Sequence, residues 1–154
     1  MAIVRALARP MLASMFVIGG LDSVRHPHPK VPAAETVVGT LTEKLPGVSN
    51  TAQVVQANGV VQVAAGGLLA LGKLPRLSAL ALAGSLVPTT LAGHSFWAET
   101  DPQKRVTQRI QFFKNVSMLG GLLLAAVDTA GKPSLGWRAK RAVSAVKEKV
   151  SGDD

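Results

Sequence analysis

Six polar residues that lie within otherwise apolar segments are the side chains of this sequence best suited to bind a ligand. They are amides, an imidazole and an ammonium group: Asn58, Gln62, His94, Gln111, Lys114 and Asn115. Such groups hydrogen-bond to carbonyl acceptors, and apolar walls accept a hydrophobic tail. The sequence therefore predicts a polar pocket for a quinone-like or other amphipathic head group. The alternative is that these groups hydrogen-bond to one another and only hold helices together.

Other kinds of site find little support in the sequence. The absence of cysteine excludes disulfides, thiolate nucleophiles and cysteine zinc sites. Three histidines, His26, His28 and His94, are enough for a catalytic metal site, but no pattern brings the third to the other two, so no metal is expected. No Ser-His-Asp order, phosphate loop or GxGxxG motif occurs, and we expect no catalytic residue. The net charge of +8 lacks a basic stripe interleaved with aromatic residues, which argues against nucleic-acid binding.

Long apolar segments must position these residues. The 154-residue chain is 47% hydrophobic and only 17% charged, whereas soluble domains average about 25% charged residues. A bilayer core needs roughly 17 to 25 apolar residues per helix, and four windows approach this length: residues 3–21, 54–72, 77–97 and 110–128. The predicted fold class is all-α, a polytopic membrane four-helix bundle.

The first window also resembles the charged and short apolar regions of a signal peptide. No convincing small-residue cleavage pattern follows it, and the pair Gly19-Gly20 suits close contact between two helices. We therefore expect this segment to remain as a membrane helix.

The distribution of cations predicts the orientation in the membrane. With four spans, both termini share one side, which collects ten of the Lys and Arg residues, whereas the opposite side has seven. Excess Lys and Arg remain cytoplasmic, so both termini should face the cytoplasm. Arg5 and Arg9 then lie at the cytoplasmic mouth of the bundle, where they anchor the helix or where Arg9 contacts a phosphate or a partner's carboxylate. Lys114 would extend to the outer interface or form an ion pair with Asp22 or Glu99.

Two segments outside the windows have patterns of their own. The prolines between His26 and Pro32 predict an extended path. A short amphipathic helix then follows, ended by Pro46-Gly47, which would lie on the outer interface or cap the bundle. Its apolar residues recur at helical spacing: Ala34, Val37, Val38, Leu41 and Leu45. Residues 1–131 form the predicted transmembrane domain, and residues 132–154 a basic amphipathic cytoplasmic tail.

Several short motifs, taken in their order along the chain, resemble the DoxX family. They are Arg9 with Gly20-Leu21-Asp22, then Gly66-Gly67-Leu68-Leu69, His94-x-Phe96-Trp97, and Gln111-x-x-Lys114-Asn115 followed by Gly120-Gly121-Leu122-Leu123. The resemblance implies a four-helix integral membrane protein, whose relatives include membrane subunits of thiosulfate:quinone oxidoreductases and partners of oxidative-stress and thiol-stress enzymes. Many relatives have an acidic residue in the second helix, where this chain has only Asn58 and Gln62. Because amides do not titrate, this departure argues against proton-coupled chemistry at that position.

The sequence thus predicts a DoxX-like membrane subunit in the plasma membrane, which binds quinone and serves soluble thiosulfate/quinone or oxidative-stress oxidoreductases. The protein would be at most one subunit of an enzyme complex and would have no covalent cofactor. It could also form a homo-oligomer. The alternative is a non-redox scaffold or cargo adaptor, whose outer excursion and basic tail would recruit partners. The eukaryotic Surfeit-locus cargo receptors are distantly similar around Phe96-Trp97 and Phe113-Lys114-Asn115, which implies that the fold need not carry redox chemistry. A small-solute transporter is the third class, although the charged midplane residues expected of coupling sites are missing.

Overall fold

The structure is a computed structural model that describes residues 2–42 and 50–128, together with residues 137, 141, 143 and 144. The elements are α1 (Ala2–Arg25), the 3-10 turn η1 (His28–Lys30), α2 (Val31–Thr42), α3 (Thr51–Ala70), α4 (Pro75–Gly93) and α5 (Pro102–Val127). No strand occurs within the described residues. The predicted all-α class is therefore confirmed for this part of the chain.

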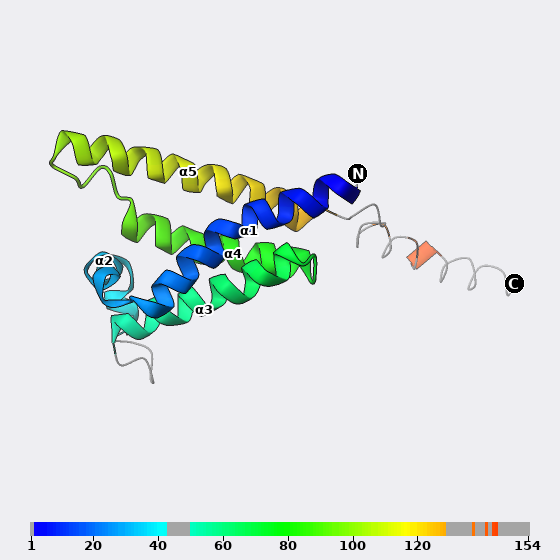
Figure 1. Cartoon of the computed structure of the whole chain (residues 1–154), viewed down its shortest axis with the longest axis horizontal. Coiled ribbons are helices and arrows are strands. Elements are labelled where there is room, and N and C mark those ends of the chain that lie inside the picture. Colours follow the sequence, from blue (N-terminus) through cyan, green and yellow to red (C-terminus); the bar gives the residue numbers. More distant parts are fainter. Residues whose placement is uncertain (1, 43–49, 129–136, 138–140, 142, 145–154) are drawn as a thin grey trace, which may run out of the picture.

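The four long helices pack in a chain of neighbours (Figure 1). Helix α1 lies along α3, α3 packs on α4, and α4 packs on α5. The short helix α2 crosses one end of α3 and α4. At the other end of the molecule, the start of α1 lies beside the end of α5.

Capping residues explain why the helices differ from the apolar windows at their ends. The side chain of Asp101 accepts hydrogen bonds from the backbone nitrogens of Gln103 (2.8 Å) and Lys104 (3.3 Å), so α5 begins well before the apolar window at residue 110. A tight turn joins α3 to α4 and contains Gly72 with φ 67° and Leu74 with φ 48°. Hydropathy depends on neither the polar cap nor the turn, so the ends of the apolar windows differ from the helix ends.

The segment after α1 is more helical than predicted. The extended path expected between His26 and Pro32 is replaced by the turn η1 and by the first residues of α2. Proline is accepted in the first turn of a helix, because its missing N–H has no intrahelical partner there. The predicted helix end at Pro46-Gly47, the boundary at residue 131 and most of the basic tail lie outside the described residues.

Helices α1 and α5 are each long and apolar enough to cross a membrane. Both have a window of mean hydropathy 1.5, and only 11% of each window is buried inside the protein. The core helix of a soluble protein would be mostly buried, so these exposed apolar surfaces suit contact with lipid. Within the described residues α3 and α4 do not meet the same criterion, and α3 contains the amides Gln56, Asn58 and Gln62.

Two glycines allow α1 and α3 to come into close contact. A Cβ atom placed on Gly20 would lie 2.7 Å from the carbonyl oxygen of Gly59, and a Cβ atom on Gly59 would lie 2.7 Å from the carbonyl oxygen of Gly20. Gly66 also faces α1, because its Cβ would lie 2.9 Å from Cγ2 of Val17. The contact is therefore a small-residue interface of the kind that packs membrane helices.

Candidate functional site

A cavity of about 370 Å³ lies beneath α2, within the size range of small-molecule pockets. Helix α2 contributes Ala33, Ala34, Val37 and Val38, and the rest of the lining comes from the end of α1, η1, α3 and the second half of α4. Ala34, Val37 and Val38 of the predicted apolar stripe thus line this cavity, whereas Leu45 lies outside the described residues. Helix α2 itself packs on α3 and α4.

Five polar side chains line the otherwise apolar cavity: Ser23, Lys30, Asn58, Thr89 and His94. They come from different elements, and hydrogen bonds hold several of them in place. Nδ2 of Asn58 donates to Oγ1 of Thr89 at 3.1 Å. Nδ1 of His94 lies 2.7 Å from Oε1 of Gln108 on α5. An apolar space with a few convergent polar groups is typical of a ligand site.

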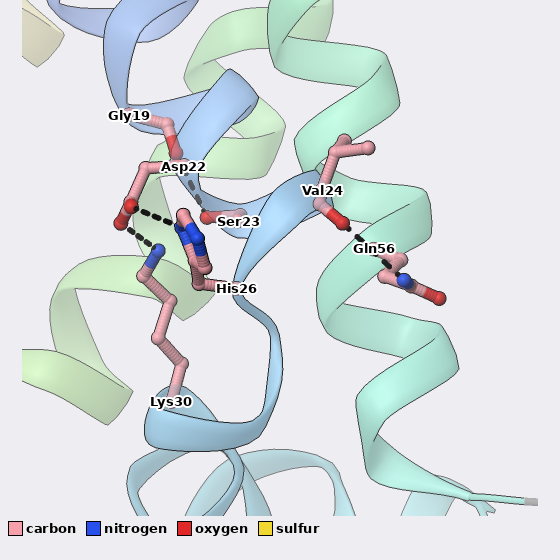
Figure 2. Close-up of polar contacts among 7 residues, drawn as sticks. All are labelled: Gly19, Asp22, Ser23, Val24, His26, Lys30 and Gln56. Atoms are coloured by element: carbon pink, nitrogen blue, oxygen red, sulfur yellow. Dashed lines mark hydrogen bonds and ion pairs between the residues drawn. The ribbon is translucent and has the colours of Figure 1, made fainter.

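Lys30 is held at the cavity by the end of α1 (Figure 2). Its ammonium group bonds to the carboxylate of Asp22, and Nδ1 of His26 lies 3.2 Å from the other oxygen of that carboxylate. Nearby, Nε2 of Gln56 on α3 donates to the carbonyl oxygen of Val24 at 3.3 Å. The bond from Lys30 to Asp22 fixes η1 against α1 and places a cation at the cavity, whereas the bond from Gln56 joins α3 to α1.

Gln62 belongs to a buried network between α3 and α4 rather than to the cavity lining. Its Nε2 donates to Oγ of Ser85 at 2.9 Å, and this hydroxyl donates to Oδ1 of Asn58 at 2.8 Å. Gln62 is 6% exposed and Ser85 7% exposed. Gln62 therefore has the alternative role considered above, in which polar residues hydrogen-bond to one another and hold helices together. Asn58 belongs to both the network and the cavity.

The three candidate residues on α5 do not line the cavity. Asn115 is buried and its Nδ2 donates to Oγ1 of Thr90 at 3.0 Å, which joins α5 to α4. Gln111 is half-buried and Lys114 is exposed. The ion pairs considered for Lys114 do not form, because the Asp22 carboxylate bonds to Lys30 and that of Glu99 accepts from backbone nitrogens.

Three of the five polar cavity residues were not predicted from the sequence: Ser23, Lys30 and Thr89. The sequence offered an indication for Thr89, because it directly follows Pro88, a proline inside α4. It offered none for Ser23 and Lys30, because only the fold-back of η1 and α2 over α3 brings them to Asn58. Within the described residues no three metal-type ligands gather.

A second polar cluster lies at the opposite end of the bundle and contains both arginines predicted at the cytoplasmic mouth. Nε of Arg5 lies 2.8 Å, and Nη2 of Arg9 3.5 Å, from Oδ2 of Asp128. Nε of Arg76 donates to the backbone oxygen of Asp128 at 3.0 Å. We call these four residues the arginine cluster. The carboxylate that Arg9 contacts thus belongs to the same chain.

Aromatic side chains gather at the end of the molecule where α4 leads into α5. The ring of Phe96 lies 5.1 Å from that of Trp97 and 5.5 Å from that of Phe112, both edge to face. Phe113 lies 5.6 Å from Phe112 and extends the group along α5. Trp is enriched where a membrane protein crosses the bilayer interface, so this aromatic group is suited to that position.

Comparison with known proteins identifies the family of this chain. The sequence profile of the DoxX family matches residues 4–95, which covers more than half of the chain. The matched residues include most of α1, all of α2 to α4 and hence the cavity, whereas α5 lies beyond them. No curated protein and no solved structure gives a significant match. The chain therefore belongs to the DoxX family.

Proposed function

We propose that this protein is a multi-pass membrane subunit that binds a quinone-like head group in the cavity beneath α2 and serves soluble oxidoreductases. The family and the two apolar helices indicate a membrane protein. The observation that carries the proposal is the combination of apolar cavity walls with Lys30, Asn58 and His94. The partner enzyme would supply the redox group for electron transfer, and this chain the quinone site.

The hydrogen bonds around His94 and Lys30 suit the two states of such a ligand. With Oε1 of Gln108 as acceptor, Nδ1 of a neutral His94 carries the proton, which leaves Nε2 as an acceptor for a hydroquinone hydroxyl. The ammonium group of Lys30 is a donor for a quinone carbonyl. An isoprenoid tail would contact valines and alanines of α2 and α3.

A direct test is to extract and quantify quinone from the full-length protein purified in detergent. We expect stoichiometric menaquinone or ubiquinone in the wild type and a loss of about ten-fold in His94→Ala, because a specific polar contact of a buried ligand disappears. Ala34→Phe should also expel the quinone by filling the cavity, without removing a polar group. Lys104→Ala, which removes an exposed cation outside the cavity, should retain it.

Lys114→Ala discriminates between the cavity and a site on α5. If this variant loses quinone while His94→Ala retains it, the ligand does not occupy the cavity beneath α2. Wild-type protein without quinone, from membranes that contain it, would overturn the redox proposal in favour of an adaptor.

The proposed topology is four membrane spans in the plasma membrane with both termini in the cytoplasm. Arg5, Arg9 and Arg76 lie at one end of the bundle, and the aromatic group lies at the other, which supports this orientation. The amides Asn58 and Gln62 are hydrogen-bonded between α3 and α4. Their burial therefore does not oppose insertion of these two helices into lipid.

Cysteine labelling tests the topology, because the natural sequence contains no cysteine. In spheroplasts treated with a membrane-impermeant maleimide, we expect Thr100→Cys to be labelled at once and Ala2→Cys only after permeabilisation. Both replaced residues are exposed, so accessibility within the protein does not limit the reaction. Labelling of Ala2→Cys in intact spheroplasts would contradict a cytoplasmic N-terminus.

A further inference from the structure

The arginine cluster has more positive charge than its own carboxylate compensates. Arg5, Arg9 and Arg76 all contact Asp128, through its carboxylate or its backbone oxygen. Two guanidinium groups contact the carboxylate, and the third donates to the backbone oxygen of the same residue. Three cations and one carboxylate leave a net charge of +2 (3 − 1). Between Asp128 and Glu148, the next acidic residue, the sequence contains five further Lys and Arg residues.

The cluster is partly shielded from solvent but remains accessible. The side chains of Arg5, Arg9 and Asp128 are 30%, 19% and 26% exposed, respectively. Partial burial weakens the screening of these charges by salt. Guanidinium groups in such a setting bind phosphate oxygens through paired, charge-assisted hydrogen bonds.

Exposed apolar side chains of α1 and α5 lie beside the cluster. Val4 and Leu7 of α1 are 66% and 61% exposed, and Leu124 and Val127 of α5 are 72% and 71% exposed. A free phosphate ion would gain nothing from these side chains. A phospholipid would gain contacts for its acyl chains on α1 and α5.

We propose that the arginine cluster is a binding site for the phosphate of one anionic phospholipid. Asp128 holds the arginines together and takes up part of their charge, and the head group compensates the remaining charge. Such a lipid would bridge the start of α1 and the end of α5, the two helices that the Arg5–Asp128 ion pair already joins. This inference depends on the membrane placement proposed above but not on the quinone cavity, so the two can fail independently.

Native mass spectrometry of the full-length protein in detergent tests this site with phosphatidylglycerol as the probe. We expect one tightly retained phosphatidylglycerol molecule, with phosphatidylcholine retained much less. Arg9→Gln should weaken retention by about ten-fold, as expected for a lost charge-assisted contact. Lys73→Gln removes an exposed cation at the same end and should weaken it by less than about three-fold.

Equal effects of Lys73→Gln and Arg9→Gln would overturn the proposal, since they would indicate attraction to the overall charge alone. A competition experiment with millimolar inorganic phosphate distinguishes a phospholipid site from a general phosphate site. If it displaces phosphatidylglycerol completely, the site accepts any phosphate anion and is not a phospholipid site.

Asp128→Asn should strengthen the retention of phosphatidylglycerol, whereas Arg9→Gln should weaken it. Removing the carboxylate raises the charge of the cluster to +3, so the variant should retain phosphatidylglycerol more tightly than the wild type does. It should also unfold at a lower temperature in phosphatidylcholine and recover stability when phosphatidylglycerol is added. Lower stability that phosphatidylglycerol does not restore would mean that the cluster is only a structural ion pair.

Discussion

Gly59→Ala is expected to lower the stability of the protein by about 1–3 kcal/mol, the usual cost of an overpacked interface. The added methyl group would lie 2.7 Å from the backbone oxygen of Gly20, a distance that real Cβ atoms essentially never show. Because that oxygen belongs to the main chain of α1, no side chain can move aside. The two helices must separate and lose contacts along their length.

The chain offers a matched control for this substitution on the same helix. Gly67 has no neighbouring atom within 4 Å of a Cβ placed on it, so Gly67→Ala should be neutral or gain the roughly 0.5–1 kcal/mol by which alanine is favoured over glycine in helices. Unfolding in detergent, followed by circular dichroism, measures both variants. Gly20→Ala and Gly19→Ala provide the same comparison on α1. Equal stability of Gly59→Ala and Gly67→Ala would show that α1 and α3 do not pack as described.

Ser85→Ala has the second-largest expected effect, a loss of about 1–3 kcal/mol in the free energy of unfolding. The hydroxyl group accepts from Nε2 of Gln62 and donates to Oδ1 of Asn58, so its removal deprives two amides of a partner. Gln62 and Ser85 are almost fully buried, and water cannot readily replace the lost bonds. Asn58 would also be held less firmly at the cavity, so retention of quinone should fall.

Ser78→Ala is the control, because Ser78 lies buried on the same helix but its hydroxyl bonds only to the nearby backbone oxygen of Lys73. We expect it to cost less than Ser85→Ala. A double-mutant cycle with Gln62→Met isolates the interhelical bond, and a coupling energy of about 0.5 kcal/mol or more is expected. Strict additivity of the two changes would contradict the network.

Only some of the polar residues predicted to form the site line the cavity. Asn58 and His94 were predicted together because amides and imidazoles within apolar segments suit a ligand's carbonyl acceptors, and both line the cavity. Gln111, Lys114 and Asn115 share a face of α5 in the sequence, but that helix does not border the cavity. Gln108, one turn earlier than Gln111, is the α5 amide that meets His94. Helical spacing predicts which residues share a face but not how far one helix is shifted along its neighbour.

The sequence by itself determined the all-α class, the family resemblance, the apolar windows and the small residues suited to helix contact. These follow from local properties, since hydropathy and helical periodicity depend only on residues close together in the chain. The tertiary structure alone decided that Gly20 and Gly59 are the glycines in contact, that α2 covers the cavity, and that Lys30 and Asp128 join distant segments. Each depends on how helices lie against one another, because a contact between distant segments is selected by the packing of the whole bundle.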